Sequence, residues 1–138
     1  MKKLKIAIIF GQKPNFNSDA LKYFILSLNK LQKTYEFFFP DVNSYIFSEG
    51  AFIYANVNSI TESFIWSNKI VADFSICINT GNFDNNFFFK CDPETKTAVA
   101  TTHIWDKHFS PPSLFDYLVH TIYTCLIYSQ ITNRGDLG

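Results

Sequence analysis

Three histidines are the side chains of this sequence best suited to chemistry, as metal ligands or as general acids and bases. His103 and His108 lie in one connecting segment and His120 follows on a predicted helix, with Asp106 and Asp116 interspersed. Their spacing matches no standard metal-binding pattern. We therefore expect His103 and His108 at the surface, His120 hydrogen-bonded, and neither metal nor cofactor bound. If a metal is bound, His103, His108 and His120 are its candidate ligands.

The predicted helix around His120 has two different faces. On a helical wheel, one face is apolar and belongs to the core: Phe115, Leu118, Val119, Ile122, Cys125 and Leu126. The opposite stripe is polar and aromatic: Tyr117, His120, Thr121, Thr124 and Tyr128. This stripe can be covered by the rest of the protein, line a cleft or meet a partner. It is the candidate ligand or partner site, and no catalytic residue is assigned.

Other catalytic patterns are incomplete. Gly11 follows a predicted strand and Gln12–Ser18 precedes a helix, which is where α/β proteins bind phosphates. The loop has neither the further glycines nor the lysine of a nucleotide-binding motif, so a plain connection is favoured. No serine lies in a G-x-S-x-G motif. Polar residues that bracket a later strand are explained equally well by turn formation: Asp73, Thr80, Asn82 and Asp84.

Composition limits the class of protein. The chain has 138 residues, of which 47% are hydrophobic and 17% charged, and its net charge is zero. This size fits one folded domain, and the absence of a basic face argues against nucleic acid and membrane partners. The three cysteines, Cys77, Cys91 and Cys125, lie in apolar surroundings. An odd and sparse set of this kind indicates reduced core thiols in a cytoplasmic protein.

Aromatic residues make up 18% of the chain, and 16 of them are phenylalanine. Codon usage in an AT-rich genome is one explanation, and the many asparagines agree with it. A surface for a protein partner is the other, because interface cores are rich in aromatic side chains.

Hydrophobic periodicity predicts that the chain begins with a strand–helix–strand unit. Leu4–Phe10 is a continuous apolar run, typical of a strand buried on both faces. Ser18 is placed to cap the following helix, and Tyr35–Phe39 is the second strand. Such a unit forms a parallel pair. The helix carries one apolar stripe: Leu21, Phe24, Ile25, Leu28 and Leu31.

The middle of the chain is less regular. For the segment Asp41–Asn58 the sequence predicts either short strands, at Tyr45–Phe47 and Ala51–Val57, or an ordered loop. Ser59 and Glu62 then form a capping-box pattern, which predicts the start of a helix. This helix should run to about residue 71 and bury three apolar side chains: Ile60, Phe64 and Val71.

Three more strands precede the last helix. Asp73–Asn79 alternates apolar and polar residues, as strands do, while Phe87–Cys91 and Thr97–Thr101 flank a turn and predict a hairpin. The last helix begins after Pro111 and Pro112. The predicted fold class is α/β, a mixed and mostly parallel sheet of about five strands with one hairpin and helices packed on it. We assign residues 1–132 to one domain and 133–138 to a polar tail.

The order of elements from Asp73 to Ser129 resembles the N-terminal half of zincin metallopeptidases, especially the small archaemetzincin-like ones. Those enzymes carry H-E-x-x-H on the last helix, with two histidines on zinc and glutamate as general base. Here the matching run is His120-Thr-Ile-Tyr-Thr124. Only its first histidine matches, because Thr121 replaces the base and Thr124 the second ligand. The resemblance therefore implies a zincin-like fold without its chemistry, whereas the plain periodicity is equally compatible with a Rossmann-like three-layer fold.

These patterns together favour a non-catalytic, cytoplasmic α/β domain that binds a protein partner or another domain, or associates with itself. It has at most a degenerate peptidase-like site. The reasons are the incomplete catalytic sets and the surplus of aromatic side chains. Two alternatives remain open. One is a metal-dependent, peptidase-like hydrolase built near His120, and the other is a sensor that binds a small molecule or nucleotide.

Overall fold

The computed structural model describes residues 3–48, 50, 53–84, 89–102 and 114–133, and in the last helix it describes side chains for 116–127. The helices are α1 (Ser18–Leu31), a short 3-10 helix η1 (Tyr54–Asn56), α2 (Val57–Ser67) and α4 (Leu114–Asn133). The strands are β1 (Leu4–Phe10), β2 (Tyr35–Phe38), β3 (Phe74–Asn79), β4 (Phe89–Asp92) and β5 (Thr97–Thr101).

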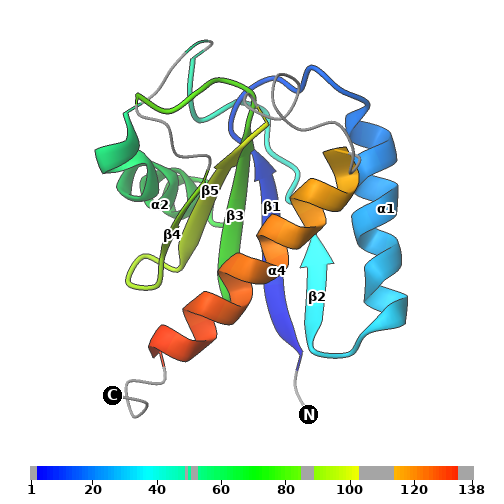
Figure 1. The fold of residues 1–138 in the computed structure, drawn as a ribbon. Coiled ribbons are helices and arrows are strands. Elements are labelled where there is room, and N and C mark those ends of the chain that lie inside the picture. The colour runs from blue at the N-terminus through cyan, green and yellow to red at the C-terminus, as the bar shows by residue number, and fades with distance from the viewer. Residues whose placement is uncertain (1–2, 49, 51–52, 85–88, 103–113, 134–138) are drawn as a thin grey trace.

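The strands form one five-stranded sheet in the order β2-β1-β3-β5-β4. β1 pairs in parallel with β2 and β3, and β3 pairs in parallel with β5. β4 is antiparallel to β5, which confirms the predicted hairpin. α1 and α4 cover one face of the sheet and α2 the other (Figure 1). The predicted α/β fold with a mixed, mostly parallel sheet is therefore confirmed.

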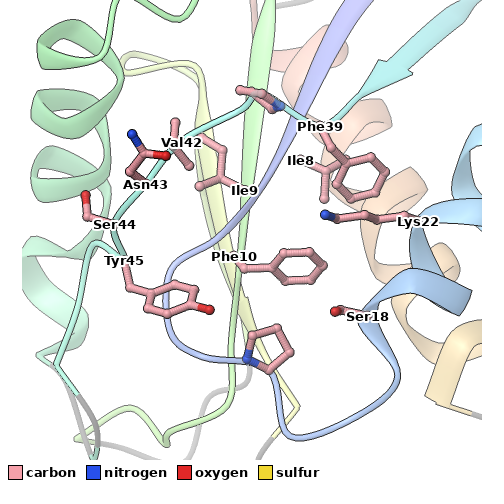
Figure 2. Close-up of a pocket in the computed structure, with 12 residues that line it drawn as sticks. Ile8, Ile9, Phe10, Ser18, Lys22, Phe39, Val42, Asn43, Ser44 and Tyr45 are labelled. Carbon is pink, nitrogen blue, oxygen red and sulfur yellow. The ribbon is translucent and has the colours of Figure 1, made fainter.

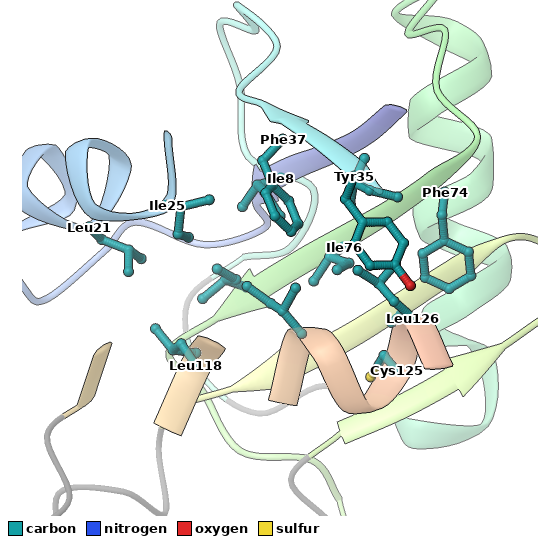
Figure 3. Packing of buried hydrophobic residues seen from close by; sticks show 14 residues of the cluster. Ile8, Leu21, Ile25, Tyr35, Phe37, Phe74, Ile76, Leu118, Cys125 and Leu126 are labelled. Atoms are coloured by element: carbon teal, nitrogen blue, oxygen red, sulfur yellow. The ribbon is translucent and has the colours of Figure 1, made fainter. Parts of the chain in front are cut away.

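The face under α1 and α4 holds the main hydrophobic core. Leu21 and Ile25 of α1 and Leu118 of α4 point onto the sheet (Figure 3). They meet side chains from alternate strand positions, among them Ile6, Ile8, Phe37, Phe74, Ile76 and Ile78. Because successive strand residues face opposite sides, each strand gives this core every second side chain.

The face under α2 is buried but much more polar. Its apolar cluster consists of Val57, Cys77, Phe83 and Val99. Between them, Asn58 of α2 donates from Nδ2 to Oγ1 of Thr97 at 3.0 Å. All six residues of β3 are buried. The alternation in that strand therefore places apolar side chains in the main core and polar side chains in the layer under α2. Neither set of side chains faces solvent.

Side-chain amides in α1 and at its C-cap cover the outer edge of β2. Asn29 donates from Nδ2 to the carbonyl of Phe37 at 3.0 Å and accepts from its N–H at 2.8 Å. Gln32 makes the same pair of bonds with Tyr35, at 2.7 and 2.8 Å. Exposed strand edges invite pairing with other chains. Here α1 satisfies the groups that a further strand would use.

Two predicted helix starts are wrong. The cap of α1 is Asn17, whose Oδ1 accepts from the N–H of Ala20 at 3.0 Å, so Ser18 is already helical. α2 begins at Val57, because η1 runs directly into it. Ser59 therefore lies inside the helix, where its Oγ donates to the carbonyl of Asn56 at 3.0 Å.

The buried face of α2 also differs from the prediction. Ile60 is 38% exposed and Val71, beyond the helix end, is 83% exposed. The residues that face the sheet are instead Val57, Asn58 and Thr61. Because this side of the sheet presents polar side chains, the helix turns its small and polar face inward. In α1, the predicted stripe residue Leu31 is 79% exposed at the helix end.

Other sequence predictions had mixed outcomes. Tyr45–Phe47 belongs to a loop, and Tyr54–Asn56 is a 3-10 helix where a strand was one alternative. β1 has the predicted bounds, whereas β2 ends one residue early, at Phe38. Residues 51–52 and the start of the last helix at 110–113 lie outside the described residues.

Candidate functional site

The crevice where α/β sheets usually bind ligands is filled by a glutamine. Such ligands bind at the carboxyl ends of the strands where the strand order reverses, which here is between β1 and β3. The side chain of Gln12 occupies this point and is 2% exposed. Its Oε1 accepts from the N–H groups of Thr80 and Gly81 at 3.0 and 2.7 Å. Its Nε2 donates to the carbonyls of Ser48 and Gly50 at 2.7 and 3.0 Å.

Gly11 is explained by packing at the same place. A Cβ on this residue would collide with Oδ1 of Asn79 and Sγ of Cys77. Its carbonyl accepts from the N–H of Phe47 at 2.8 Å, and its own N–H donates to Ile78 at 2.9 Å. These contacts account for the glycine that follows β1 and give no support to a phosphate site in the loop.

The predicted stripe on α4 does not converge on one site. Tyr117 donates its hydroxyl to the carbonyl of Thr101 at 3.0 Å, and burial raises its pKa to about 12. Thr121 is buried and donates to the carbonyl of Tyr117 at 2.9 Å. Thr124 and His120 are exposed, and Thr124 donates to the carbonyl of His120 at 2.8 Å. The side chain of Tyr128 lies outside the described residues.

Metal-ligating side chains of the described residues are equally dispersed, and the buried thiol of Cys77 is not placed for reactivity. His103 and His108 fall outside the described residues, and within the described part of the chain no three His, Cys, Asp or Glu side chains form a cluster able to hold a metal. Burial raises the pKa of the Cys77 thiol to about 12. Since the thiolate is the nucleophile, Cys77 is suited to packing and not to catalysis.

A groove of about 600 Å³ lies at the opposite end of the sheet, beside the amino ends of β3 and β5. It is lined by the last turns of α2, the segment that leads into β3 and the turn between β4 and β5. Its apolar residues are Ile65, Trp66, Ile70, Val71 and Ala72. Two hydroxyl side chains, Ser75 and Thr95, and four charged residues complete it: Glu62, Lys69, Glu94 and Lys96. Trp66 is 78% exposed and Val71 is 83% exposed.

A left-handed residue at the end of α2 shapes this groove. Lys69 has φ of 55°, the N–H of Lys69 donates to Trp66 at 3.2 Å, and the N–H of Ile70 donates to Ile65 at 3.1 Å. This pair of bonds is the Schellman motif, in which the left-handed position is usually glycine. The motif turns the chain back, so that Ile70 and Val71 line the groove together with Trp66. Because lysine and not glycine occupies this position, the sequence did not predict the motif.

A second, smaller cavity of about 250 Å³ lies at the carboxyl ends of β1 and β2. The first half of α1 and the segment after β2 close its sides (Figure 2). It contains Lys22 and several aromatic side chains. None of its residues was considered as part of a site, apart from Pro14 and Ser18 in the segment that follows Gly11.

The fold places this chain in the α/β class of proteins. Comparisons of the chain with known protein families, curated protein sequences and solved structures found no match. The resemblance to zincin metallopeptidases therefore stays a prediction. Among the residues that the structure describes, no helix is long and apolar enough to cross a membrane.

Proposed function

We propose that this α/β domain is a non-catalytic binding module that pairs with a second copy of itself through the groove at the end of α2. The observation that carries the proposal is Trp66, which is 78% exposed beside an apolar groove of about 600 Å³. We further propose a cytoplasmic location, which is supported by the free thiols of Cys77, Cys91 and Cys125.

The groove differs from ordinary exposed apolar residues because its members are contiguous. Tyr23 and Leu31 of α1 are as exposed as Trp66, at 80% and 79%, but neither lines this groove or the smaller cavity. Scattered residues of that kind are normal on protein surfaces. Trp66 and Val71 lie instead on one groove with a charged rim. Interfaces share this anatomy, and tryptophan is enriched among the residues that dominate their binding energy.

The charges around the groove are balanced in sign. Glu62 and Glu94 supply two negative charges, and Lys69 and Lys96 supply two positive ones. A two-fold dimer places the same patch of both copies face to face. A patch of one sign would repel its own copy, whereas a balanced patch can place each lysine against a glutamate. This balance favours a second copy over a strongly charged partner.

The two lysines of the rim occupy costly backbone conformations. Lys69 and Lys96 both have φ of 55°, and they are the two non-glycine residues with positive φ in the described part of the chain. A left-handed conformation costs an L-residue about 1–2 kcal/mol, and glycine would avoid most of it. A contribution of both lysine side chains to binding would explain why lysine, and not glycine, occupies these two positions.

The first test replaces the aromatic anchor. Trp66→Ala should convert a dimer into a monomer, or weaken dimerisation by at least about tenfold, as expected for an interface anchor. Sedimentation equilibrium and native mass spectrometry measure this over a range of concentrations. Tyr23→Ala is the matched control, because Tyr23 is an equally exposed helical aromatic away from the groove. A wild-type protein that stays monomeric at millimolar concentration contradicts the proposal.

The second test uses charge reversal to show which surface pairs. Glu62→Lys with Glu94→Lys makes the rim wholly positive, and Lys69→Glu with Lys96→Glu makes it wholly negative. Each double variant should be monomeric, since its patch repels its own copy. An equal mixture should form a heterodimer that native mass spectrometry resolves. If the separate variants dimerise as the wild type does, pairing occurs through another surface.

A further inference from the structure

The small cavity beside Lys22 has the chemistry of a ligand site. Strand β1 contributes Phe10, the segment after β2 contributes Phe39 and Tyr45, and α1 contributes Ser18 and Lys22 (Figure 2). These residues come from three separate parts of the sequence. The cavity lies at the carboxyl ends of parallel strands, beside the crevice that Gln12 fills, and this end of α/β sheets is where ligands commonly bind.

Two phenylalanines form an aromatic wall of this cavity. The rings of Phe10 and Phe39 are stacked, with centroids 6.0 Å apart and planes 22° from parallel. Ile8 and Val42 extend the apolar surface. An apolar cavity with a few converging polar groups is the usual form of a small-molecule site.

The ammonium of Lys22 lies over this aromatic wall. Its Nζ is 5.9 Å from the centroid of the Phe10 ring and 5.8 Å from that of Phe39. The hydroxyl groups of Ser18 and Tyr45 also point toward the Phe10 ring (Figure 2). A cation and two hydroxyl groups thus line the cavity together with the Phe10 ring, and all three can donate hydrogen bonds to an anion.

The described residues that line the cavity carry a net positive charge. Among the described residues that line it, Lys22 is the single cation and none is acidic. Asp19 lies one turn before Lys22 on α1 but does not line the cavity. The two rings attract the ammonium of Lys22, and an anionic ligand would supply the counter-charge that these lining residues lack.

Size and charge together define the class of ligand. A volume of about 250 Å³ is slightly below the range of ~300–1,000 Å³ that is common for ligand sites. That volume is small for a dinucleotide, and one lysine balances one negative charge and not a triphosphate. The aromatic wall favours a flat or branched apolar body. We propose that this cavity binds a small organic monocarboxylate with an aromatic or branched apolar body, with its carboxylate on Lys22.

The proposal does not depend on dimerisation, since the cavity and the groove lie at opposite ends of the sheet. It is tested on the wild-type chain with phenylacetate as the probe and its neutral amide as the comparison. Two-dimensional NMR should show saturable shifts of the amides of Phe10, Lys22 and Tyr45 with phenylacetate. The neutral amide should bind at least about tenfold more weakly, because the charge-assisted bond to Lys22 is lost.

A variant and its control locate the carboxylate. Lys22→Met should weaken phenylacetate binding by at least about tenfold, because it removes the cation and keeps the length of the side chain. Lys30→Met, an exposed lysine on the same helix, should bind as the wild type does. If Lys22→Met does not fold, the comparison of acid and amide in the wild type decides the question.

Three results would overturn the proposal. They are the absence of saturable shifts with phenylacetate, equal affinity for the acid and the amide, and a folded Lys22→Met variant with undiminished affinity. Inorganic phosphate provides a further comparison. If phosphate shifts the same amides with equal affinity, the cavity recognises anions in general and the assignment to carboxylates is wrong.

Discussion

The two faces of the sheet are both buried but are held by different interactions. Under α1 and α4, aliphatic and aromatic side chains fill one continuous core. Under α2, four apolar residues are mixed with polar side chains that bond across the layer. The hydrophobic effect is non-directional and scales with buried apolar area, whereas a hydrogen bond contributes little net stability and requires defined geometry. The difference teaches that equal burial does not imply equal stabilisation.

The α2 face also carries unsatisfied groups. Within the described part of the chain, Oδ1 of Asn58 and Nδ2 of Asn79 are buried without a hydrogen-bond partner. An unsatisfied buried polar atom costs about 1–3 kcal/mol. The helix that covers this polar layer, α2, also carries Trp66 and lines the groove. We therefore expect α2 to be held less tightly than α1 and α4, and the following predictions test this contrast.

The largest effect should come from the apolar face. Leu118→Ala removes a fully buried side chain of α4 and should cost about 2–5 kcal/mol of unfolding free energy. Val57→Ala is the counterpart on α2, also fully buried. It should cost about 1–2 kcal/mol, at ~0.8 kcal/mol for each buried methylene lost. Urea unfolding followed by circular dichroism measures both, and an equal loss for each carbon atom removed at the two sites would remove the proposed contrast.

A smaller effect is expected from the polar bridge. Asn58→Ala removes the bond to Thr97, and also the weaker 3.3 Å contacts to the carbonyls of Lys90 and Thr97. The loss should be about 1 kcal/mol, because removal of the unsatisfied Oδ1 offsets part of the cost. Ser63→Ala, an exposed hydroxyl on the same helix, should change stability by less than about 0.5 kcal/mol. A loss above 3 kcal/mol for Asn58→Ala would show that the polar layer is as stabilising as the core.

The smallest effect should be a gain in stability. Lys69→Gly relieves the left-handed conformation at the end of α2 and should stabilise the fold by about 0.5 kcal/mol. The measurement is best made together with Trp66→Ala, so that dimerisation does not contribute. Lys30→Gly, inside α1, should instead cost about 1 kcal/mol. If Lys69→Gly destabilises the fold by a similar amount, the side chain of Lys69 has a structural role that its φ angle does not reveal.

The main layers of the fold were predictable because they depend on short apolar runs. Leu4–Phe10 and Thr97–Thr101 are strands within the bounds that the sequence predicted. Asp73–Asn79 was correct to one residue. The apolar face of α4 was also correct at four described positions, which are all buried: Leu118, Ile122, Cys125 and Leu126. Val119, predicted on the same face, is only half-buried. In each case the pattern of apolar residues alone selects the element and its buried face.

The α2 region was not predictable in the same way. Its buried residues include Asn58 and Thr61, which resemble a solvent face until Thr97 and Cys77 are known to lie opposite. Its C-terminal turn has lysine where glycine is usual, so the motif that exposes Val71 left no sequence signal. Local propensity fails where the partner of a residue is a distant strand.

The sequence by itself determined an α/β chain with a mostly parallel sheet, one hairpin and a final helix with a buried apolar face. The tertiary structure alone decided that Gln12 fills the usual ligand crevice and that Lys22 lies over Phe10 and Phe39. It also placed Trp66 and Val71 on one groove. The physical reason is the distance along the chain between the residues that form a site. Periodicity records whether a residue is buried, but a site forms from side chains that only the packing of distant segments brings together.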